Sequence, residues 1–421
     1  MVFRLLILLL LLSPSAEAAN RNVLLLLADD IGVTDSAIYD APGAPPTPNL
    51  QALADRGLLY TNVWANPVCV PTRGTIYTGR YGFRTGLLLN PPYTGTEPAM
   101  RLSEITISEA LGHGWSRAHI GKWHVSSGSN DPGLQGWPYY AGPPPHSSAT
   151  GGGYYHWRKW TNGTSQISTT YATTDQVNEA IAAIDRATAE AKPYYLEVAF
   201  NAPHGPFHRP PLELLPPKYQ KLPRTGATDR QYFEAMMAAL DTEIGRLLTH
   251  VDFASTTVIY LADNGTTGRN LLPPYPANHG KTSVYQPGVL VPMIVAGAAV
   301  VNPGRRVASM INTVDIYPTV LALAGAPPAA HPIDGVSFLA TIDGNERSKR
   351  DWVYAEVRTQ RAIADGRYKL ISTSQGRQFY DLTADPLEEH ELLARGPLRT
   401  EQQVAYAQLR RKLAQLLTSS P

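Results

Sequence analysis

The chain is organised around one segment, Asn66-Pro67-Val68-Cys69-Val70-Pro71-Thr72-Arg73-Gly74-Thr75-Ile76-Tyr77-Thr78-Gly79-Arg80. This segment contains Cys69, the only cysteine among the 421 residues. The chain opens like an exported protein, and in an oxidising compartment a lone cysteine has no disulfide partner within its own chain. Two interpretations remain: Cys69 is a small buried apolar residue, or it carries chemistry.

The neighbours of Cys69 predict that it lies at or just before a helix N-terminus. Pro71 suits the first turn of a helix, where its missing N–H would have no partner, and Gly79 suits the helix end. The free N–H groups and the positive end of the helix dipole favour an anion there. Arg73 adds a planar fork of donors for an oxyanion. A nucleophile on such an anion-binding turn indicates transfer of a phosphoryl or sulfuryl group.

The pattern Cys69-Val70-Pro71-Thr72-Arg73, closed by Thr78-Gly79-Arg80, resembles the signature of the sulfatase family. In that family a dedicated enzyme oxidises the cysteine to Cα-formylglycine, and the hydrate of this aldehyde is the nucleophile. The resemblance therefore implies that Cys69 is converted to Cα-formylglycine, with a formylglycine-generating enzyme as the maturation partner.

The N-terminus and the composition predict where the protein works. Residues 1–19 have the charged start, the apolar run and the small-x-small site of a secretory signal peptide, with cleavage near Ala18/Ala19; an uncleaved anchor is the alternative. No other stretch is apolar enough to cross a membrane. We expect an exported protein, periplasmic or secreted, without stable membrane insertion. The net charge of +1 argues against a nucleic-acid partner.

Apolar strands alternate with amphipathic helices through residue 325, which predicts an α/β domain with a large, mostly parallel sheet sandwiched by helices. The resemblance implies the same architecture, alkaline-phosphatase-like. Further along, Asp365-Gly366 is a hairpin-turn signal between two strand patterns, and a helix pattern follows. We predict a signal peptide (1–19), a catalytic domain (20–340) and a smaller C-terminal domain of antiparallel sheet plus helix (341–421).

Polar residues directly follow four of the predicted strands. These residues are Asp29 and Asp30, Lys122 and His124, His204, and Asp263 and Asn264. Ligands of such sheets bind beyond the carboxyl ends of the strands. The adjacent carboxylates of Asp29 and Asp30 repel each other unless a cation or solvent compensates. They indicate either a site for a hard metal ion or a solvated turn.

The resemblance extends to Gly121-Lys122-Trp123-His124, Ala202-Pro203-His204-Gly205-Pro206 and Gly280-Lys281. It implies metal ligands at Asp29, Asp30, Asp263 and Asn264, with the group derived from Cys69 beside them. We favour Ca²⁺, one ion in the site, because all four ligands are oxygens; Mg²⁺ is the alternative.

The same resemblance implies a catalytic set of Cys69, Arg73, Lys122, His124, His204 and Lys281. Arg73 and the two lysines would hold the sulfate oxygens and the nucleophile. His204, with Lys281, would give a proton to the leaving alcohol. His124 would take a proton from the second hydroxyl of the formylglycine hydrate.

The expected reaction is hydrolysis of sulfate esters, of arylsulfatase type, on a sulfated small molecule or glycan. One alternative is a phosphonate monoester or phosphodiester hydrolase with the same nucleophile. A less favoured alternative is an inactive protein that binds sulfated glycans.

Three local patterns complete the prediction. Residues 126–170, rich in Gly, Pro, Ser and Tyr, are expected to form a long loop or small ribbon over the site, with several tryptophans in or near it. Thr173 and Thr228 each begin a Thr-x-x-Gln pattern that predicts a capping box at a helix start. Ser103 is expected to cap a short helix that ends near Gly112.

Overall fold

The computed structural model describes residues 22–90, 99–126, 128, 130–147, 152–345 and 348–419. The signal peptide predicted at 1–19 lies outside these residues. Among the helices in the described ranges, none has both the length and the hydropathy that crossing a membrane requires.

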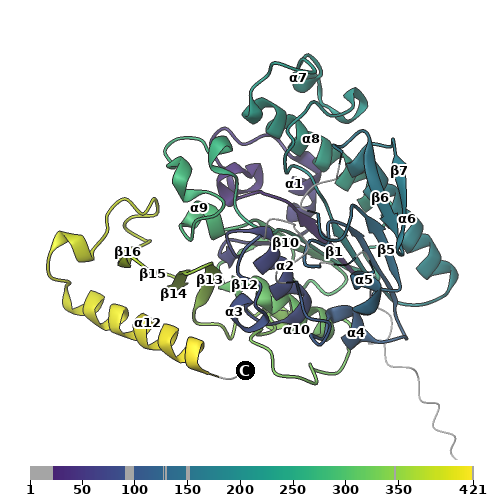
Figure 1. The fold of residues 1–421 in the computed structure, drawn as a ribbon. Helices are drawn as coiled ribbons and strands as arrows, with labels where there is room; N and C mark the ends of the chain where they lie inside the picture. Colours follow the sequence, from purple (N-terminus) through teal and green to yellow (C-terminus); the bar gives the residue numbers. More distant parts are fainter. Residues whose placement is uncertain are drawn as a thin grey trace, which may run out of the picture.

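A large mixed sheet of ten strands forms the centre of the described structure (Figure 1). Its strands, in spatial order, are β11 (Arg305–Val307), β2 (Gly57–Tyr60), β10 (Met293–Gly297), β9 (Thr256–Ala262), β1 (Asn22–Ala28), β8 (Tyr194–Ala199), β4 (Ser116–Gly121), β5 (Tyr139–Gly142), β6 (Trp157–Thr161) and β7 (Thr164–Ser168). The central strands β9, β1, β8, β4 and β5 are mutually parallel, whereas β10, β6 and β7 run antiparallel to their neighbours. This confirms the predicted fold class.

Helices flank the sheet in two groups (Figure 1). One group consists of α1 (Pro48–Asp55), α6 (Ala172–Ala189) and α8 (Asp229–Leu248), and the other of α2 (Cys69–Thr78), α4 (Ile107–Leu111) and α10 (Ile316–Leu323). Short helices connect the strands: α3 (Gly82–Thr85), α5 (Asp131–Leu134), α7 (Pro217–Gln220), α9 (Gln286–Val289) and α11 (Leu339–Ile342). A two-stranded sheet pairs β3 (Val63–Trp64) with β12 (Ile311–Asn312).

Strand β1 shows why the sequence forms this sheet. Its apolar side chains from Val23 to Ala28 are all buried, as expected for a parallel strand covered on both faces. Burying each leucine side chain stabilises the fold by about 1.5–3 kcal/mol. The strand pairs with β8 on one side and β9 on the other, so it lies at the middle of the sheet.

The carboxyl ends of four parallel strands meet at one edge of the sheet. The N–H of Asp263 donates to the carbonyl of Ala28 at 3.0 Å. The N–H of Lys122 donates to the carbonyl of Ala199 at 2.7 Å. Gly121, with a φ of 95°, allows the end of β4 to lie this close to the end of β8, since a Cβ at position 121 would lie 2.0 Å from the carbonyl oxygen of Ala199. The residues that follow these strands are therefore brought together by the sheet itself.

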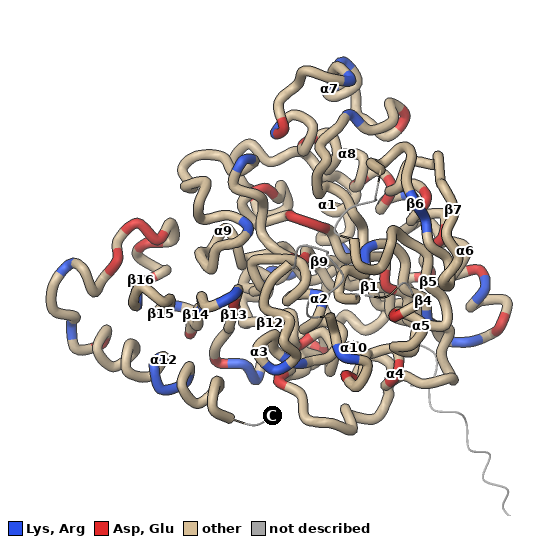
Figure 2. Tube along the Cα trace, viewed as in Figure 1, with Lys and Arg blue, Asp and Glu red and all other residues tan. Residues whose placement is uncertain are grey.

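A separate four-stranded antiparallel sheet lies toward the C-terminus: β13 (Val353–Val357), β14 (Gln360–Ala364), β15 (Tyr368–Thr373) and β16 (Gly376–Asp381). Helix α12 (Thr400–Thr418) contacts this sheet. Figure 1 shows both at the opposite side of the molecule from β6 and β7. Figure 2 shows residues of both charge signs along α12 and around the large sheet, as expected for a chain of net charge +1.

Three local expectations were wrong. The described part of residues 126–170 is not a cover over the site, because β5, β6 and β7 extend the large sheet, and Trp137 and Trp157 are buried in its core. Thr106, and not Ser103, precedes α4 and forms a capping box with Glu109. The Thr-x-x-Gln pattern at Thr228 does begin α8, but the pattern at 173 lies inside α6, which begins at 172.

Candidate active site

Cys69 is the first residue of α2, and the extended residue Val68 precedes it. Gly79 ends the helix in the left-handed conformation, with a φ of 67°. These observations confirm the helix predicted from the sequence. The N–H of Val70 donates to the side-chain oxygen of Asn90 at 2.9 Å, so one donor at the helix N-terminus already has a partner. The thiol of Cys69 is fully buried.

Three charged side chains, two from lysines and one from an aspartate, lie around this thiol. The Nζ atoms of Lys122 and Lys281 lie 3.2 Å and 3.4 Å from Sγ of Cys69. An oxygen of Asp29 lies 3.5 Å from the same sulfur. Cys69 is therefore part of a charged cluster, and the interpretation of a cysteine in apolar surroundings is wrong.

Three carboxylates converge next to the thiol. Ligand atoms of Asp29, Asp30, Asp263 and Cys69 lie within 4.8 Å of one another, a group that could hold a metal ion. Asn264 donates from Nδ2 to Asp30 at 2.8 Å, while its buried Oδ1 has no hydrogen-bond partner among the described residues. A buried oxygen without a partner costs free energy. A hard cation would satisfy this oxygen, so the donor set fits such an ion.

Arg73 holds one of these carboxylates in place. Its Nε and Nη2 donate to the same oxygen of Asp263 at 3.1 Å and 2.8 Å, and its Nη1 donates to the carbonyl of Lys122 at 2.5 Å. The guanidinium is fully buried. Arg73 thus connects α2 to the ends of β9 and β4 and orients Asp263.

Each lysine also pairs with a carboxylate. Lys122 Nζ lies 2.5 Å from Asp29, and Lys281 Nζ lies 2.5 Å from Asp30. Together with the pair that Arg73 makes, the cluster holds three basic and three acidic side chains and has no net formal charge. It can accept a cation and an anion together without accumulating charge.

Burial and neighbouring charges shift the pKa values of Asp29 and Asp30 in opposite directions. Burial, followed by the charge of Asp263, raises the pKa of Asp29 to about 7. Burial would also raise the pKa of Asp30, but Lys281 and other nearby positive groups lower it below its usual range. Burial, reinforced by Asp263 and Asp29, raises the pKa of the Cys69 thiol to about 12.

The two predicted histidines flank the cluster. Burial and the charge of Arg73 hold the pKa of His124 well below its ordinary value. Burial also lowers the pKa of His204 to about 4, although Asp30, 3.9 Å from its Nε2, opposes the shift. The Nδ1 atom of His204 lies 2.8 Å from the carbonyl of Gly205. Burial thus favours the neutral form of both imidazoles, whereas the carboxylate of Asp30 favours the protonated form of His204.

Backbone strain is concentrated at this edge of the sheet. Asp30 and His124 have φ angles of 70° and 68°, in the left-handed region that costs a non-glycine residue on the order of 1–3 kcal/mol. Such strain persists only where the surrounding structure imposes it, and it clusters at functional sites.

Sequence patterns missed residues that position the site. The hydroxyl of Tyr154 donates to the carbonyls of Asn201 and His204 at 2.6 Å and 2.8 Å. Gln176 on α6 donates to the side chain of Asn201 at 2.8 Å. Asn90, which accepts from the first turn of α2, was also missed. Tyr154 and Asn90 belong to no local pattern, and the pattern that contains Gln176 predicts only a helix start, so only the folded chain identifies these roles.

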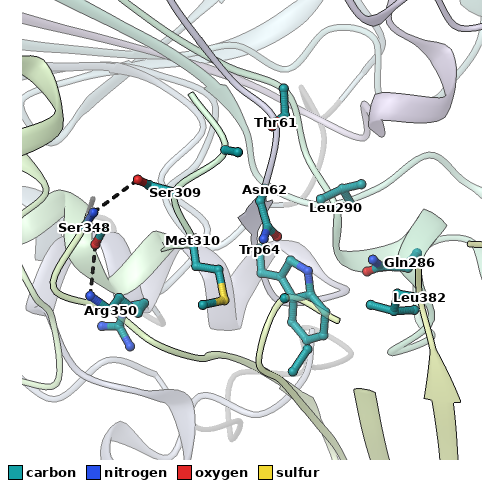
Figure 3. Close-up of a pocket in the computed structure, with 13 residues that line it drawn as sticks. Thr61, Asn62, Trp64, Gln286, Leu290, Ser309, Met310, Ser348, Arg350 and Leu382 are labelled. Atoms are coloured by element: carbon teal, nitrogen blue, oxygen red, sulfur yellow. Dashed lines mark hydrogen bonds between the residues drawn. The ribbon is translucent and has the colours of Figure 1, made fainter. Parts of the chain in front are cut away.

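A different hollow lies where the small sheet meets the large one, and Figure 3 shows the residues that line it. It has a volume of about 710 Å³ and includes Trp64, Met310 and Arg350. Arg350 is bound to Asp315, so its charge is already compensated. None of the predicted site residues lines this hollow, which separates it from the cluster around Cys69.

The ends of the parallel strands thus gather a cysteine thiol, three carboxylates and three cationic side chains, an arrangement suited to an α/β enzyme whose ligand is an oxyanion. The chain belongs to the sulfatase family, a family of sulfuric ester hydrolases: the family model for sulfatase matches residues 21–326. A second model, N-sulphoglucosamine sulphohydrolase, C-terminal, matches residues 277–419.

Relatives and solved structures agree with this assignment. The chain is 29% identical over 352 residues to the uncharacterized sulfatase YdeN of Escherichia coli, covering 76% of this chain but 60% of that protein. It is 29% identical over 422 residues to arylsulfatase A of Bos taurus, covering 88% and 78% of the two chains. The structure of Ps i-CgsB in complex with k-i-k-neocarrahexaose matches with a TM-score of 0.81 at 24% identity, covering 95% and 93%. The structure of BT4656 in complex with D-glucosamine-2-N,6-O-disulfate matches with a TM-score of 0.76 at 19% identity, covering 96% and 99%. At these identities the two structural matches establish the fold.

Proposed function

We propose that this protein hydrolyses sulfate esters, with arylsulfatase-type chemistry, at the cluster around Cys69. One observation carries the proposal: the thiol of the only cysteine in the chain lies between two lysine ammonium groups and beside three converging carboxylates. Lysines that contact a nucleophile can also hold the oxygens of the anion it attacks. Membership of the sulfatase family supports sulfate over other anions.

Cys69 is converted to Cα-formylglycine by a formylglycine-generating enzyme in this proposal. The hydrated aldehyde supplies a hydroxyl nucleophile and, through its second hydroxyl, a route for release of sulfate without attack by external water. Asp29, Asp30, Asp263, Asn264 and the side chain at 69 would hold one divalent cation, Ca²⁺ in preference to Mg²⁺, because the carboxylate and amide donors are oxygens. Such a cation, when bound, supplies Lewis-acid activation and charge neutralisation.

The remaining residues have separate roles. Lys122 and Lys281 hold the side chain at position 69 and the oxygens of the ester. Arg73 keeps Asp263 in its orientation through two hydrogen bonds to one oxygen. His204, with Lys281 beside it, gives a proton to the leaving alcohol oxygen, and His124 takes a proton from the group at position 69. The two imidazoles come from different segments, after β4 and after β8, so that one can act as the acid and the other as the base.

The substrate is a sulfated small molecule or glycan. Export through the peptide predicted at 1–19 would place the enzyme where such molecules occur. The division into a catalytic domain (20–340) and a C-terminal domain (341–421) is part of the same proposal, supported by the separate sheet that begins at β13.

The test is a substrate panel on protein produced with and without a formylglycine-generating enzyme. The panel contains an aryl sulfate, D-glucosamine-2-N,6-O-disulfate, k-i-k-neocarrahexaose, an aryl phosphonate monoester and a phosphodiester. Release of sulfate that depends on co-production supports the proposal. Faster turnover of the phosphonate or phosphodiester would identify the alternative hydrolase instead.

Mass analysis of the peptide that contains Cys69, from the native host, tests the modification separately. An aldehyde is the expected result. An unmodified thiol together with no turnover of any probe would show a binding protein and contradict the proposed activity.

A further inference from the structure

A second pocket lies close to His204, outside the cluster described above. Its volume is about 810 Å³, and Tyr155, Tyr171, His208, Arg209 and Arg224 are among the residues that line it. None of the residues proposed for catalysis or metal binding lines this pocket. Its wall therefore has no role in the reaction as proposed so far.

The pocket and the site share one rigid wall. His208 follows His204 by four residues, and its Nδ1 lies 2.8 Å from the carbonyl of Pro206. The ring of Tyr154 lies 4.4 Å from the ring of His208, while its hydroxyl donates to the carbonyl of His204. Four residues of chain span at most about 14 Å. The wall of the pocket therefore begins within this distance of His204.

The exposure of the site residues indicates the direction of entry. The side chains of His204 and Lys281 are 22% and 11% exposed, whereas those of Asp29, Arg73 and Lys122 are fully buried. A substrate approaches past the first two residues. His204 lies on this exposed side of the cluster, and the segment that follows it continues into the wall of the pocket.

The pocket carries an uncompensated positive charge. Arg209 is held in place, because its Nη1 donates to the carbonyl of Leu222 at 3.0 Å and its own carbonyl accepts the hydroxyl of Tyr155 at 2.7 Å. Arg224 is exposed, and none of the described side chains forms an ion pair or hydrogen bond with it. Glu213 contributes one carboxylate to the lining, so the two guanidinium groups leave an excess of one positive charge.

An aromatic surface lies beside these arginines. The rings of Tyr155 and Tyr171 lie 5.1 Å apart, and that of His208 lies 5.6 Å from Tyr171. Tyr155 is 45% exposed, whereas Tyr171 is buried and holds the surface in place. An exposed ring on a fixed base is suited to pack against the apolar face of a sugar, while guanidinium groups bind sulfate or carboxylate through charged hydrogen bonds.

We propose that this pocket binds a second, anionic sugar unit of a sulfated oligosaccharide while the ester to be cleaved lies at Cys69. The proposal rests on the proposed function and specifies its substrate class: sulfated oligosaccharides in preference to monosaccharides and small aryl sulfates. A small aryl sulfate fills the cluster without reaching the pocket, so the pocket contributes only to longer substrates.

The experiment compares kcat/KM for a sulfated hexasaccharide with kcat/KM for an aryl sulfate in the mature enzyme. R224Q and Y155A each lower this ratio by about 5- to 20-fold, because each removes one contact to the second sugar. R411Q, which removes an exposed arginine on α12, is the matched control and leaves the ratio as in the wild type. Melting temperatures of all variants show that the fold is intact.

The outcomes separate this inference from the proposed function. If the wild type releases sulfate from the aryl ester but R224Q and Y155A keep the ratio of R411Q, the pocket has no role in substrate binding and the inference alone is wrong. If the wild type releases sulfate from no probe, the proposed function is wrong, and the inference that depends on it is wrong as well.

Discussion

Two buried groups of charges in this molecule use the same residue types in opposite ways. At the junction with the small sheet, each oxygen of Asp315 accepts one backbone N–H, from Asn312 at 2.9 Å or from Val336 at 2.8 Å, and both oxygens also accept from Arg350. At the strand ends, three carboxylates face one another, and the Oδ1 of Asn264 has no hydrogen-bond partner among the described residues.

The difference shows how to distinguish a structural ion pair from a site. The pair of Arg350 and Asp315 is complete within the protein, and the guanidinium also donates to the hydroxyl of Tyr81 at 3.2 Å. Figure 3 shows Arg350 at the edge of the hollow, and its charge is already paired with that of Asp315. The strand-end cluster, in contrast, leaves the buried Oδ1 of Asn264 without a hydrogen-bond partner among the described residues, next to three carboxylates that could hold a metal ion. A buried polar atom that has no hydrogen-bond partner within the protein therefore indicates a functional site, whereas burial of charged groups alone does not.

The largest expected effect lies at the strand ends. C69S loses at least about 10⁴-fold in kcat on an aryl sulfate, because a serine hydroxyl cannot be oxidised by the same route to the aldehyde that the proposed reaction requires. The fold is retained, since serine differs little in volume and lies beside polar groups. Sulfate release and a melting curve measure the two properties. A turnover similar to that of the wild type would contradict the proposed chemistry.

A substitution at the Arg350–Asp315 pair, at the junction with the small sheet, is expected to change stability and not catalysis. R350M lowers the free energy of unfolding by about 3–5 kcal/mol, because it leaves Asp315 buried without its cation. Urea unfolding followed by circular dichroism measures the loss. The double variant R350M/D315N removes both charges and keeps a side-chain oxygen that can accept one of the two backbone N–H groups, so it is expected to recover part of the loss. If R350M is as stable as the wild type, the pair does not hold the junction together.

Glu356, in the small sheet, predicts how the free energy of unfolding depends on pH. It is buried and accepts from the N–H of Phe83 at 2.8 Å and from the hydroxyl of Tyr354 at 3.0 Å, but burial still raises its pKa to about 7. Between the ordinary value of 4.5 and about 7 the folded protein binds more protons than the unfolded chain. Its contribution to the free energy of unfolding therefore falls by up to about 3 kcal/mol as the pH rises through this window.

E356Q removes this contribution. The difference in unfolding free energy between the wild type and E356Q, measured by urea titration at several pH values, is expected to change between pH 4.5 and 7 and to be constant above that window. A parallel dependence of both proteins on pH would show that Glu356 does not titrate in this range.

The sequence predicts the strand-end cluster well because the relevant rule is local. A buried apolar run followed at once by Asp29-Asp30 or Asp263-Asn264 indicates a strand and its carboxyl end, and parallel neighbours place those ends at one edge. The helix of Cys69 was predicted for the same reason, since Pro71 and Gly79 act on their own turns.

Tertiary contacts decide what the sequence does not predict. Thr173 and Thr228 begin the same Thr-x-x-Gln pattern, yet only Thr228 caps its helix. Helix α6 begins directly after Tyr171, before the predicted cap at Thr173. Tyr171 is buried, and its hydroxyl lies 3.0 Å from Nε2 of His208. Similarly, the contact of Tyr154 with the His204 loop joins segments about 50 residues apart, and no local pattern encodes it.

The smallest of the expected effects tests whether the strand-end cluster is completed by a cation. Addition of Ca²⁺ at 100 times its dissociation constant raises the free energy of unfolding of the mature protein by about 2.7 kcal/mol, and chelation reverses the change. D263N loses most of this response, because it removes one of the three converging carboxylates. The matched variant D40N, at an exposed carboxylate paired with Arg306, keeps it. Equal Ca²⁺ responses of D263N and D40N would mean that the cation binds elsewhere, and the contrast between a complete junction and an incomplete site would lose its physical basis.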